Sequence, residues 1–397
     1  MDVEGLTLDL AVKLISIPSV TGEEDKLARF ILDVLKGNDV NAFIDDWGNV
    51  VAVVGKGKPT FLLNGHMDTV PPAPNWTLDP YKPHIDGDLL YGLGSSDMKG
   101  TLAAMIATTI MVNKLYKDDM KGTLVFSAVV GEEGGNVWGS KLLAEKGILK
   151  DVGLDYAIVG ESSINNGILG VRIGHNGNLN VKVTIKGKSY HSSKPTLGVN
   201  AAYRMCELLE SIKTLDYTLP IMKLPENVTP PLIKGTIAPT IVKCGQKINV
   251  IPGECEVFIN RRIAYGENVE DAYKQILEIV NGLDAKDRAL YGNPELKCEV
   301  ELLTSRPPYM LDLNDVRGRR LLETSINALK RIGIDKPQLI YGTGYTDAEI
   351  IHRITGAPVV IIGAGETAHT PDEWVKISNL KKVAKAYMEI VKEIMLG

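Results

Sequence analysis

The sequence contains few cysteines, and their spacing excludes the common thiolate metal sites. Only Cys206, Cys244, Cys255 and Cys298 occur in 397 residues, and no two of them form a C-x-x-C pair. Zinc sites built on thiolates use such closely spaced pairs. We therefore expect reduced thiols without a metal role, so that any metal must be held by histidine and carboxylate side chains.

The sequence also lacks an excess of positive charge and a long apolar segment. Its formal net charge is −5, which offers no electrostatic attraction to nucleic acid. The longest helical apolar stretch, residues 101–112, is about half of the ~20 residues needed to span a bilayer. The N-terminus has no basic region of a secretory signal. We expect a soluble, cytoplasmic protein with no nucleic-acid or membrane partner.

The length and the order of apolar patterns predict two domains. A chain of 397 residues is too long for one ordinary core. Residues 1–175 and 307–397 alternate helix-like and strand-like patterns, which predicts an α/β domain with a mixed, largely parallel sheet flanked by helices. Residues 176–306 follow a β-α-β-β-α-β order, typical of a ferredoxin-like α+β fold. We predict that this smaller domain is inserted into the first.

The predicted elements are short and bounded by glycine, proline or capping residues. In the α/β domain, strands are expected at 50–54, 60–63, 124–130, 156–159 and 358–362, and helices at 6–16, 23–35 and 101–112. In the inserted domain, strands are expected at 179–185, 236–242, 254–259 and 296–303, and helices at 200–212 and 269–280.

Two motifs with polar residues lie in the first quarter of the chain. In NGHMDTV, His66 could ligate a metal while Asp68 accepts the other ring N–H. Taken alone, this fragment favours a His–Asp pair satisfied within a loop. In GLGSSDMKG, Asp97 is either the N-cap of the following helix or a carboxylate that bridges two cations.

A third motif, GEEGG, directly follows a very apolar strand. Its adjacent carboxylates, Glu132 and Glu133, repel each other unless a cation or a proton lies between them. Surface glutamate pairs are commonly just solvated, but the apolar strand and the glycines favour a functional pair. One glutamate can bind metal while its neighbour takes a proton from an attacking water.

Two further residues complete a candidate site. Glu161 follows the strand at 156–159, and His369 follows the strand at 358–362. Each alone is an ordinary strand-end residue, but ligands bind beyond the carboxyl ends of strands in open α/β sheets. Carboxylates mixed with imidazole suit zinc or a similar divalent ion. The five expected ligands are His66, Asp97, Glu133, Glu161 and His369.

Taken together, the motifs resemble those of the dizinc metallopeptidase family of acetylornithine deacetylases, succinyl-diaminopimelate desuccinylases, aminoacylases and glutamate carboxypeptidases. GHMDTVPP, YGLGSSDMKG, GEEGG, GES and AHTPDE occur in the family's order, and the match covers essentially the whole chain. The resemblance implies that His66 and Glu161 hold one metal and that Glu133 and His369 hold the other. Asp97 and a water or hydroxide would bridge them. The expected cofactor is two divalent ions, with Zn²⁺ first and Co²⁺ or Mn²⁺ as alternatives.

The resemblance also implies roles around the metals. Glu132 would be the general base, and Asp68 would orient His66. The family often has a cis peptide after the position of Asp97. Lys99 and Asp372 lie within the motifs without an assigned role.

The inserted domain resembles the family's lid and dimerisation domain, which implies a homodimer. His191 matches a histidine that helps to hold the oxyanion and enters from the partner subunit in dimeric relatives; without this match it is an exposed loop histidine. Asn249 and Arg262 match lid positions, and Arg262 is expected to bind the substrate carboxylate through a bidentate fork. Relatives usually carry Asp where Asn260 stands. Gly344 lies in a loop expected to line the substrate, although its spacing departs from the commonest form.

The resemblance predicts hydrolysis of the amide bond of an N-acyl amino acid by a metal-bridged hydroxide with a glutamate base. The small-molecule substrate is then an N-acyl amino acid, of the deacetylase or desuccinylase type, or a short peptide. A carboxypeptidase or dipeptidase of the same family is the alternative. A silent binding protein is disfavoured because all expected ligands and the base are present. An aminopeptidase is disfavoured by the inserted domain.

Overall fold

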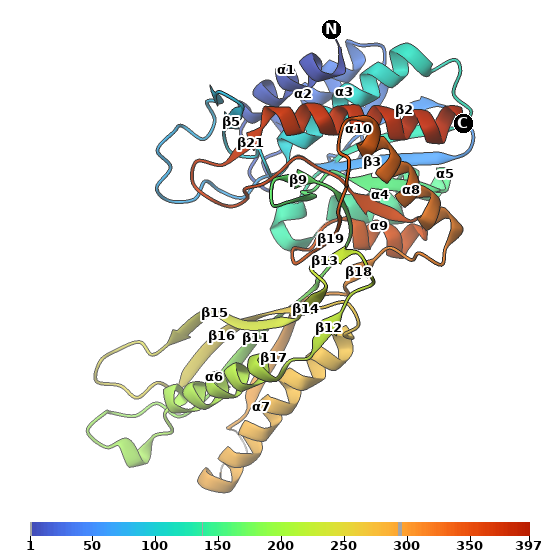
Figure 1. The fold of residues 1–397 in the computed structure, drawn as a ribbon. Helices are drawn as coiled ribbons and strands as arrows, with labels where there is room; N and C mark the ends of the chain where they lie inside the picture. Colours follow the sequence, from blue (N-terminus) through green and yellow to red (C-terminus); the bar gives the residue numbers. More distant parts are fainter. Residues whose placement is uncertain (1, 137, 293–295) are drawn as a thin grey trace.

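The computed structural model describes residues 2–136, 138–292 and 296–397, and its two largest sheets lie in separate regions (Figure 1). The larger region is built from the N-terminal and C-terminal parts of the chain. The smaller region extends away from it and is formed by the middle of the chain. No helix in the described ranges has the length and apolarity needed to cross a membrane.

A ten-stranded sheet forms the centre of the larger region. Its neighbours β6, β3, β7 and β20 run parallel, whereas β1, β2 and β10 pair antiparallel with strands beside them. The predicted mixed, largely parallel sheet is confirmed. In spatial order the strands are β1 (Asn41–Ile44), β2 (Val50–Gly55), β6 (Thr123–Val129), β3 (Thr60–His66), β7 (Tyr156–Val159), β20 (Val359–Ile361), β10 (Val171–His175), β19 (Leu339–Gly342) and β13 (Val228–Thr229), with β18 (Tyr309–Met310) paired to β10.

Helices cover both faces of this sheet. Neighbouring strand residues such as Phe61 and Leu62 are fully buried in different cores on opposite faces. Burial on both faces explains why the strands are continuous apolar runs. Burying each such side chain stabilises the folded state by about 1.5–3 kcal/mol. One face is packed against α1 (Val3–Ile15), α2 (Asp25–Lys36), α3 (Lys99–Tyr116), α8 (Val316–Arg331) and α10 (Ile377–Leu396). The other is packed against α4 (Trp138–Glu145), α5 (Ile148–Val152) and α9 (Ala348–Thr355).

The smaller region contains a four-stranded antiparallel sheet with helices on one face. Its spatial order is β15 (Thr236–Cys244), β16 (Glu254–Ile263), β11 (Gly177–Lys186) and β17 (Cys298–Arg306). Alternate residues of β11 pack under α6 (Ala201–Thr218) and α7 (Val269–Tyr291). This pattern arises because successive side chains of a strand point to opposite faces and helices cover only one face of this sheet. This is the ferredoxin-like order of two β-α-β units. The domain limits at 175/176 and 306/307 stay a prediction, and β13, from within the predicted insertion, pairs with the large sheet.

Short elements connect these layers. A hairpin of β12 (Ile221–Lys223) and β14 (Leu232–Lys234) lies between the two regions (Figure 1). The remaining elements are β4 (His84–Asp86), β5 (Leu89–Tyr91) and β21 (Trp374–Lys376) in one small sheet, β8 (Ile164–Asn165) with β9 (Ile168–Leu169), a π-helical turn at Glu132–Asn136 and a 3₁₀ turn at Pro195–Leu197.

The prediction that all cysteines are reduced is wrong for one pair. Cys244 and Cys255 form a disulfide between β15 and β16. They are directly opposite in the antiparallel register, with their Cα atoms 4.3 Å apart. Sequence spacing could not reveal this, because the strand pairing alone brings the two residues together. Cys206 and Cys298 are free thiols.

Candidate metal centre and active site

The expected ligands meet at one edge of the large sheet. His66 is the last residue of β3, and Glu132 and Glu133 follow β6 after a two-residue connection. Glu161 follows β7, and His369 lies in the loop after β20. Because β6, β3, β7 and β20 are parallel, their carboxyl ends share this edge.

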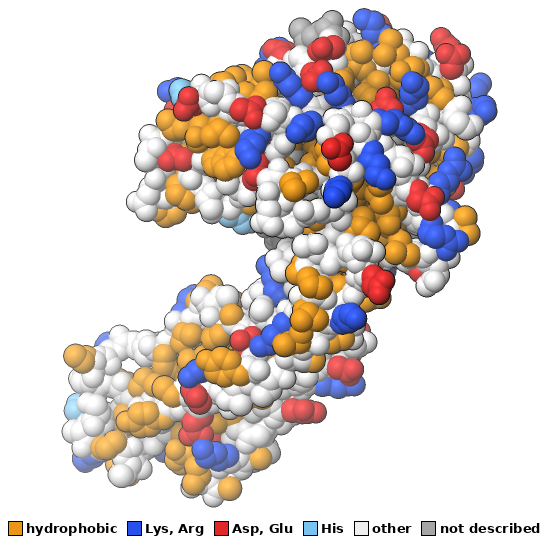
Figure 2. Space-filling view, viewed as in Figure 1, with side chains coloured by type: hydrophobic (Ala, Val, Ile, Leu, Met, Phe, Trp, Pro, Cys, Tyr) orange, Lys and Arg blue, Asp and Glu red, His pale blue; other side chains and the backbone are white. Residues whose placement is uncertain are grey.

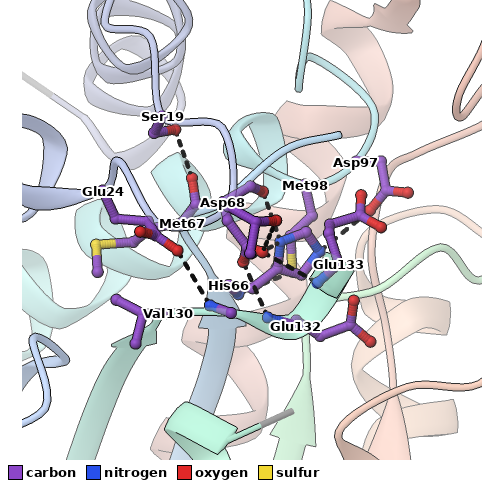
Figure 3. Close-up of polar contacts among 12 residues, drawn as sticks. Ser19, Glu24, His66, Met67, Asp68, Asp97, Met98, Val130, Glu132 and Glu133 are labelled. Atoms are coloured by element: carbon purple, nitrogen blue, oxygen red, sulfur yellow. Dashed lines mark hydrogen bonds and ion pairs between the residues drawn. The ribbon is translucent and has the colours of Figure 1, made fainter. Parts of the chain in front are cut away.

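Two donor sets share the carboxylate of Asp97. His66 Nε2 lies 3.2 Å from Asp97 Oδ1 and 3.3 Å from Glu161 Oε1. His369 Nε2 lies 3.5 Å from Asp97 Oδ2 and 3.0 Å from Glu133 Oε1. Figure 3 shows His66, Asp97 and Glu133 directed toward one another. The structure therefore brings all five expected ligands together.

The spacing and chemistry of these donors fit two divalent cations. Two ligands about 2.0–2.1 Å from a tetrahedral zinc ion lie roughly 3.3 Å apart, close to the separations within each set. Atoms of His66, Asp97 and Glu133 approach within 4.8 Å of one another, and so do atoms of His66, Glu132 and Glu161. Carboxylates this close repel one another without positive charge between them.

Asp68 holds neighbouring residues of the site in place through hydrogen bonds. Its carboxylate accepts hydrogen bonds from the backbone N–H groups of Glu132 (3.1 Å) and Glu133 (3.0 Å) and from the hydroxyl of Thr21 (2.7 Å). Figure 3 shows Asp68 between His66 and the two glutamates. The acceptor nearest to His66 Nδ1 is the backbone oxygen of Asp68 at 2.9 Å, while its carboxylate lies at 3.5 Å. Although burial opposes it, hydrogen bonding to His66 and Thr21 lowers the pKa of Asp68.

Glu132 is held in an environment that favours its protonated form. Burial raises its pKa well above the usual value, and the nearby charges of Glu161, Asp347 and Glu133 add to this effect. Burial also raises the pKa of Glu133, against the opposing hydrogen bond to His369. A carboxylate whose proton affinity is raised accepts a proton more readily.

Asp97 is not the N-cap of α3. That helix begins at Lys99 with Met98 at the capping position, and no side chain caps it. The carboxylate of Asp97 instead lies between the two histidines, which excludes the N-cap interpretation. The peptide bond from Asp97 to Met98 is cis, as the resemblance implies.

A cleft of about 470 Å³ opens beside the ligands, and residues from both regions line it. Figure 2 shows the concave surface between the two regions. The predicted Arg262 and Gly344 line this cleft. Arg172 and Arg306 also line the cleft, and they were not predicted from the sequence. Arg172 could have been noticed because it is a charged residue inside the otherwise apolar start of the buried strand β10.

Arg172 and Arg306 are each held by the large region or its loops. Arg172 is buried and donates a hydrogen bond to the backbone oxygen of Gly344. The guanidinium of Arg306 lies over the ring of Tyr345, 4.7 Å from its centroid. No described acceptor receives a hydrogen bond from the side chain of Arg262, which is half-buried. The cleft therefore carries a cluster of positive charge next to the carboxylates.

His191 and Asn249 do not line the cleft of their own chain. His191 is exposed, shares a hydrogen bond between Nδ1 and the hydroxyl of Ser193 (2.8 Å), and forms a β-bridge with Val250. The backbone oxygen of Asn249 accepts the N–H of Ser192. His191 follows the C-terminal end of β11, and Asn249 lies in the connection from β15 to β16, at the end of the small sheet where Lys186 pairs with Glu254.

Comparisons with known proteins agree with this geometry. The model of Peptidase family M20/M25/M40 matches residues 62–393. Succinyl-diaminopimelate desuccinylase from Buchnera aphidicola subsp. Acyrthosiphon pisum (strain Tuc7) is 31% identical, with 98% of each chain covered. The same enzyme from Hydrogenovibrio crunogenus (strain DSM 25203 / XCL-2) is 29% identical, covering 98% of this chain and 99% of its own.

Solved structures share the fold at low identity. An M20 family metallo-carboxypeptidase from Sulfolobus solfataricus superposes with a TM-score of 0.77 at 19% identity, covering 97% of this chain and 98% of its own. A dinuclear metal binding peptidase of the M20 family from Bacillus subtilis superposes with a TM-score of 0.71 at 16% identity, covering 99% and 98%.

Proposed function

We propose that this chain, which belongs to peptidase family M20/M25/M40 and is a metal-dependent amide hydrolase, cleaves the amide bond of an N-acyl amino acid. The observation that carries the proposal is the pair of donor sets that share Asp97 beside an arginine-lined cleft. The acyl group we favour is succinyl, since the relatives named above are desuccinylases, and acetyl is the alternative that the family resemblance leaves open.

We assign the ligands as His66 and Glu161 for one ion and Glu133 and His369 for the other, with Asp97 between them. When bound, two divalent ions would polarise the scissile carbonyl and lower the pKa of an attacking water. The donor set favours Zn²⁺, with Co²⁺ or Mn²⁺ as alternatives.

Glu132 acts in this proposal as the general base. Its carboxylate takes the proton of the attacking water and delivers it to the leaving nitrogen. Asp68 holds the backbone N–H groups of both Glu132 and Glu133, so that the base and a ligand keep their relative positions.

The arginines of the cleft account for selectivity toward a carboxylate. Arg262 can bind a carboxylate through two parallel N–H groups, and no described side chain competes as its acceptor. Gly344 also lines the cleft, and its backbone oxygen accepts a hydrogen bond from Arg172.

A carboxypeptidase or dipeptidase is the second candidate, because the same chemistry serves a peptide amide. The experiment is a panel of N-succinyl and N-acetyl amino acids, N-blocked dipeptides and unblocked peptides, compared by kcat/KM. We expect the acylated amino acids to be preferred at least tenfold. A preference for blocked dipeptides would establish the second candidate, and release of N-terminal residues from unblocked peptides would favour an aminopeptidase.

We also propose a homodimer formed through the smaller region, with His191 and Asn249 entering the cleft of the second copy. The edge strand β15 leaves Ile241 and Val242 exposed, and Tyr203 on α6 is 72% exposed. Exposed apolar groups beside an unpaired strand edge favour association. Mixing His191→Ala and Glu132→Gln subunits should restore activity that neither has alone. Absence of restoration, despite demonstrated subunit exchange, would exclude a shared site.

A further inference from the structure

The loop that carries Asp97 is tied to the loop that carries His369. These loops come from opposite ends of the larger region's sequence, yet each supplies a donor to the candidate metal centre. The distance from Asp97 Oδ2 to His369 Nε2 is 3.5 Å. Pairing of β5 with β21 places Tyr91 opposite Trp374 and so brings the two loops near each other, but neither Asp97 nor His369 lies in these strands. Contacts beyond this strand pair must therefore set the distance.

The side chain of Glu373 connects the two loops directly. Its side chain, fully buried, accepts hydrogen bonds from the backbone N–H groups of Ser96 (2.8 Å) and Asp97 (3.0 Å) at one oxygen. Its other oxygen accepts the N–H of Gly94 (3.1 Å). One carboxylate thus satisfies three amides of the turn that presents Asp97, and it follows His369 by four residues in the chain.

Ser96 makes the reciprocal connection. Its hydroxyl accepts the backbone N–H groups of Glu366 and Thr367, each at 2.9 Å. The two segments approach so closely here that a Cβ on Gly365 would lie 2.4 Å from the backbone oxygen of Ser96. Only glycine allows this contact.

We propose that Glu373, assisted by Ser96, is a positioning residue that sets Asp97 against His369 so that one carboxylate serves both metal positions. Glu373 touches the backbone of a ligand and not the substrate, so it acts through Asp97. Removing such a support typically costs 10–100-fold in metal affinity or activity. The inference rests on the proposed function, since it assumes two ions at this centre.

The test compares Glu373→Gln with Asp372→Asn. The glutamine keeps the shape of the side chain, but its amide nitrogen cannot accept the N–H groups that the carboxylate accepts. Asp372 is a matched control because its carboxylate also accepts three hydrogen bonds, from the N–H and hydroxyl of Thr77 and the N–H of Leu78, away from Asp97.

Zn²⁺ affinity is measured on the full chain by competition with a chromophoric chelator, together with the absorption spectrum of the Co²⁺-loaded protein and kcat and KM. We expect Glu373→Gln to weaken binding of one ion at least tenfold, change the Co²⁺ spectrum and lower kcat, with KM within about twofold. Asp372→Asn should match the parent. Should Glu373→Gln fail to fold, Ser96→Ala decides, with a smaller loss in the same direction.

Parent-like affinity and spectrum in folded Glu373→Gln, or in Ser96→Ala when the first variant does not fold, would overturn the inference. An equal loss in Asp372→Asn would also overturn it, because the effect would then be general to the segment. A parent protein that binds no Zn²⁺ would be a different failure, since it would overturn the proposed function itself.

Discussion

The two sheets of this protein differ in how many faces are covered, and this decides where their polar residues lie. Both faces of the ten-stranded sheet are packed under helices, so its strands are apolar and its chemistry-bearing residues gather beyond the strand ends. The four-stranded sheet has one covered face, and its other face carries alternating polar residues such as Lys182, Asn260 and Glu256. A sheet buried on both sides concentrates function at an edge, whereas a half-covered sheet spreads polar groups along a surface.

Two lysines, one in each region, show a similar contrast. In the larger region Lys99 is fully buried and donates a hydrogen bond to the backbone oxygen of Ile17, and burial lowers its pKa to about 7. In the smaller region Lys182 is paired with Glu256 on the open face, and this hydrogen bond raises its pKa. Burial therefore disfavours the charged form of Lys99, whereas solvent and Glu256 favour the charged form of Lys182.

The largest expected effect is at the strand-end cluster. Glu132→Gln should lower kcat by about 10²–10⁴-fold with both metals retained, because only the proton acceptor is removed. Glu256→Gln, on the open face of the small sheet, should leave kcat unchanged. The measurement is kcat together with metal content by elemental analysis. Activity within a few-fold of the parent in Glu132→Gln would show that this residue is not the base.

Core truncations test whether the two regions unfold separately. Phe126→Ala in the large sheet should cost about 3–5 kcal/mol, and Ile276→Ala under the small sheet about 2–5 kcal/mol, since both side chains are fully buried. If the regions are separate domains, Ile276→Ala should destabilise only one of two transitions in denaturant and leave Zn²⁺ binding intact. A single shared transition displaced by both variants would instead show one cooperative unit.

The smallest effect, measured per pH unit, is the pH dependence of stability. The folded-state pKa of Lys99 is about 7, below its unfolded value of about 10.4. Between these values the unfolded chain binds more protons, so stability should rise with pH by up to about 1.4 kcal/mol per unit. Lys99→Met should remove this rise in metal-free protein, while Lys182→Met should retain it. Parallel stability curves for Lys99→Met and the parent between pH 7 and 10 would contradict the assignment.

The sequence predicted site residues at strand ends and in glycine-rich loops. His66, Glu133 and Glu161 could be found because an apolar run ends in a polar residue, and the parallel arrangement then brings such ends together. Arg172 was missed because it lies within a strand, and the role of Glu373 was missed because its partners are backbone amides some 280 residues earlier. The pairing of Cys244 with Cys255 was likewise invisible without the strand register.

By itself, the sequence determined which residues are buried, which ends of strands carry donors, and that a β-α-β-β-α-β segment interrupts an α/β chain, because periodicity is a local property of the backbone. Only the tertiary structure showed that the carboxylate of Asp97 lies near both histidines, which the family resemblance had implied, and that Glu373 accepts a hydrogen bond from the backbone N–H of Asp97. Those contacts depend on which strands are neighbours and how loops from distant segments cross, and no local pattern encodes that.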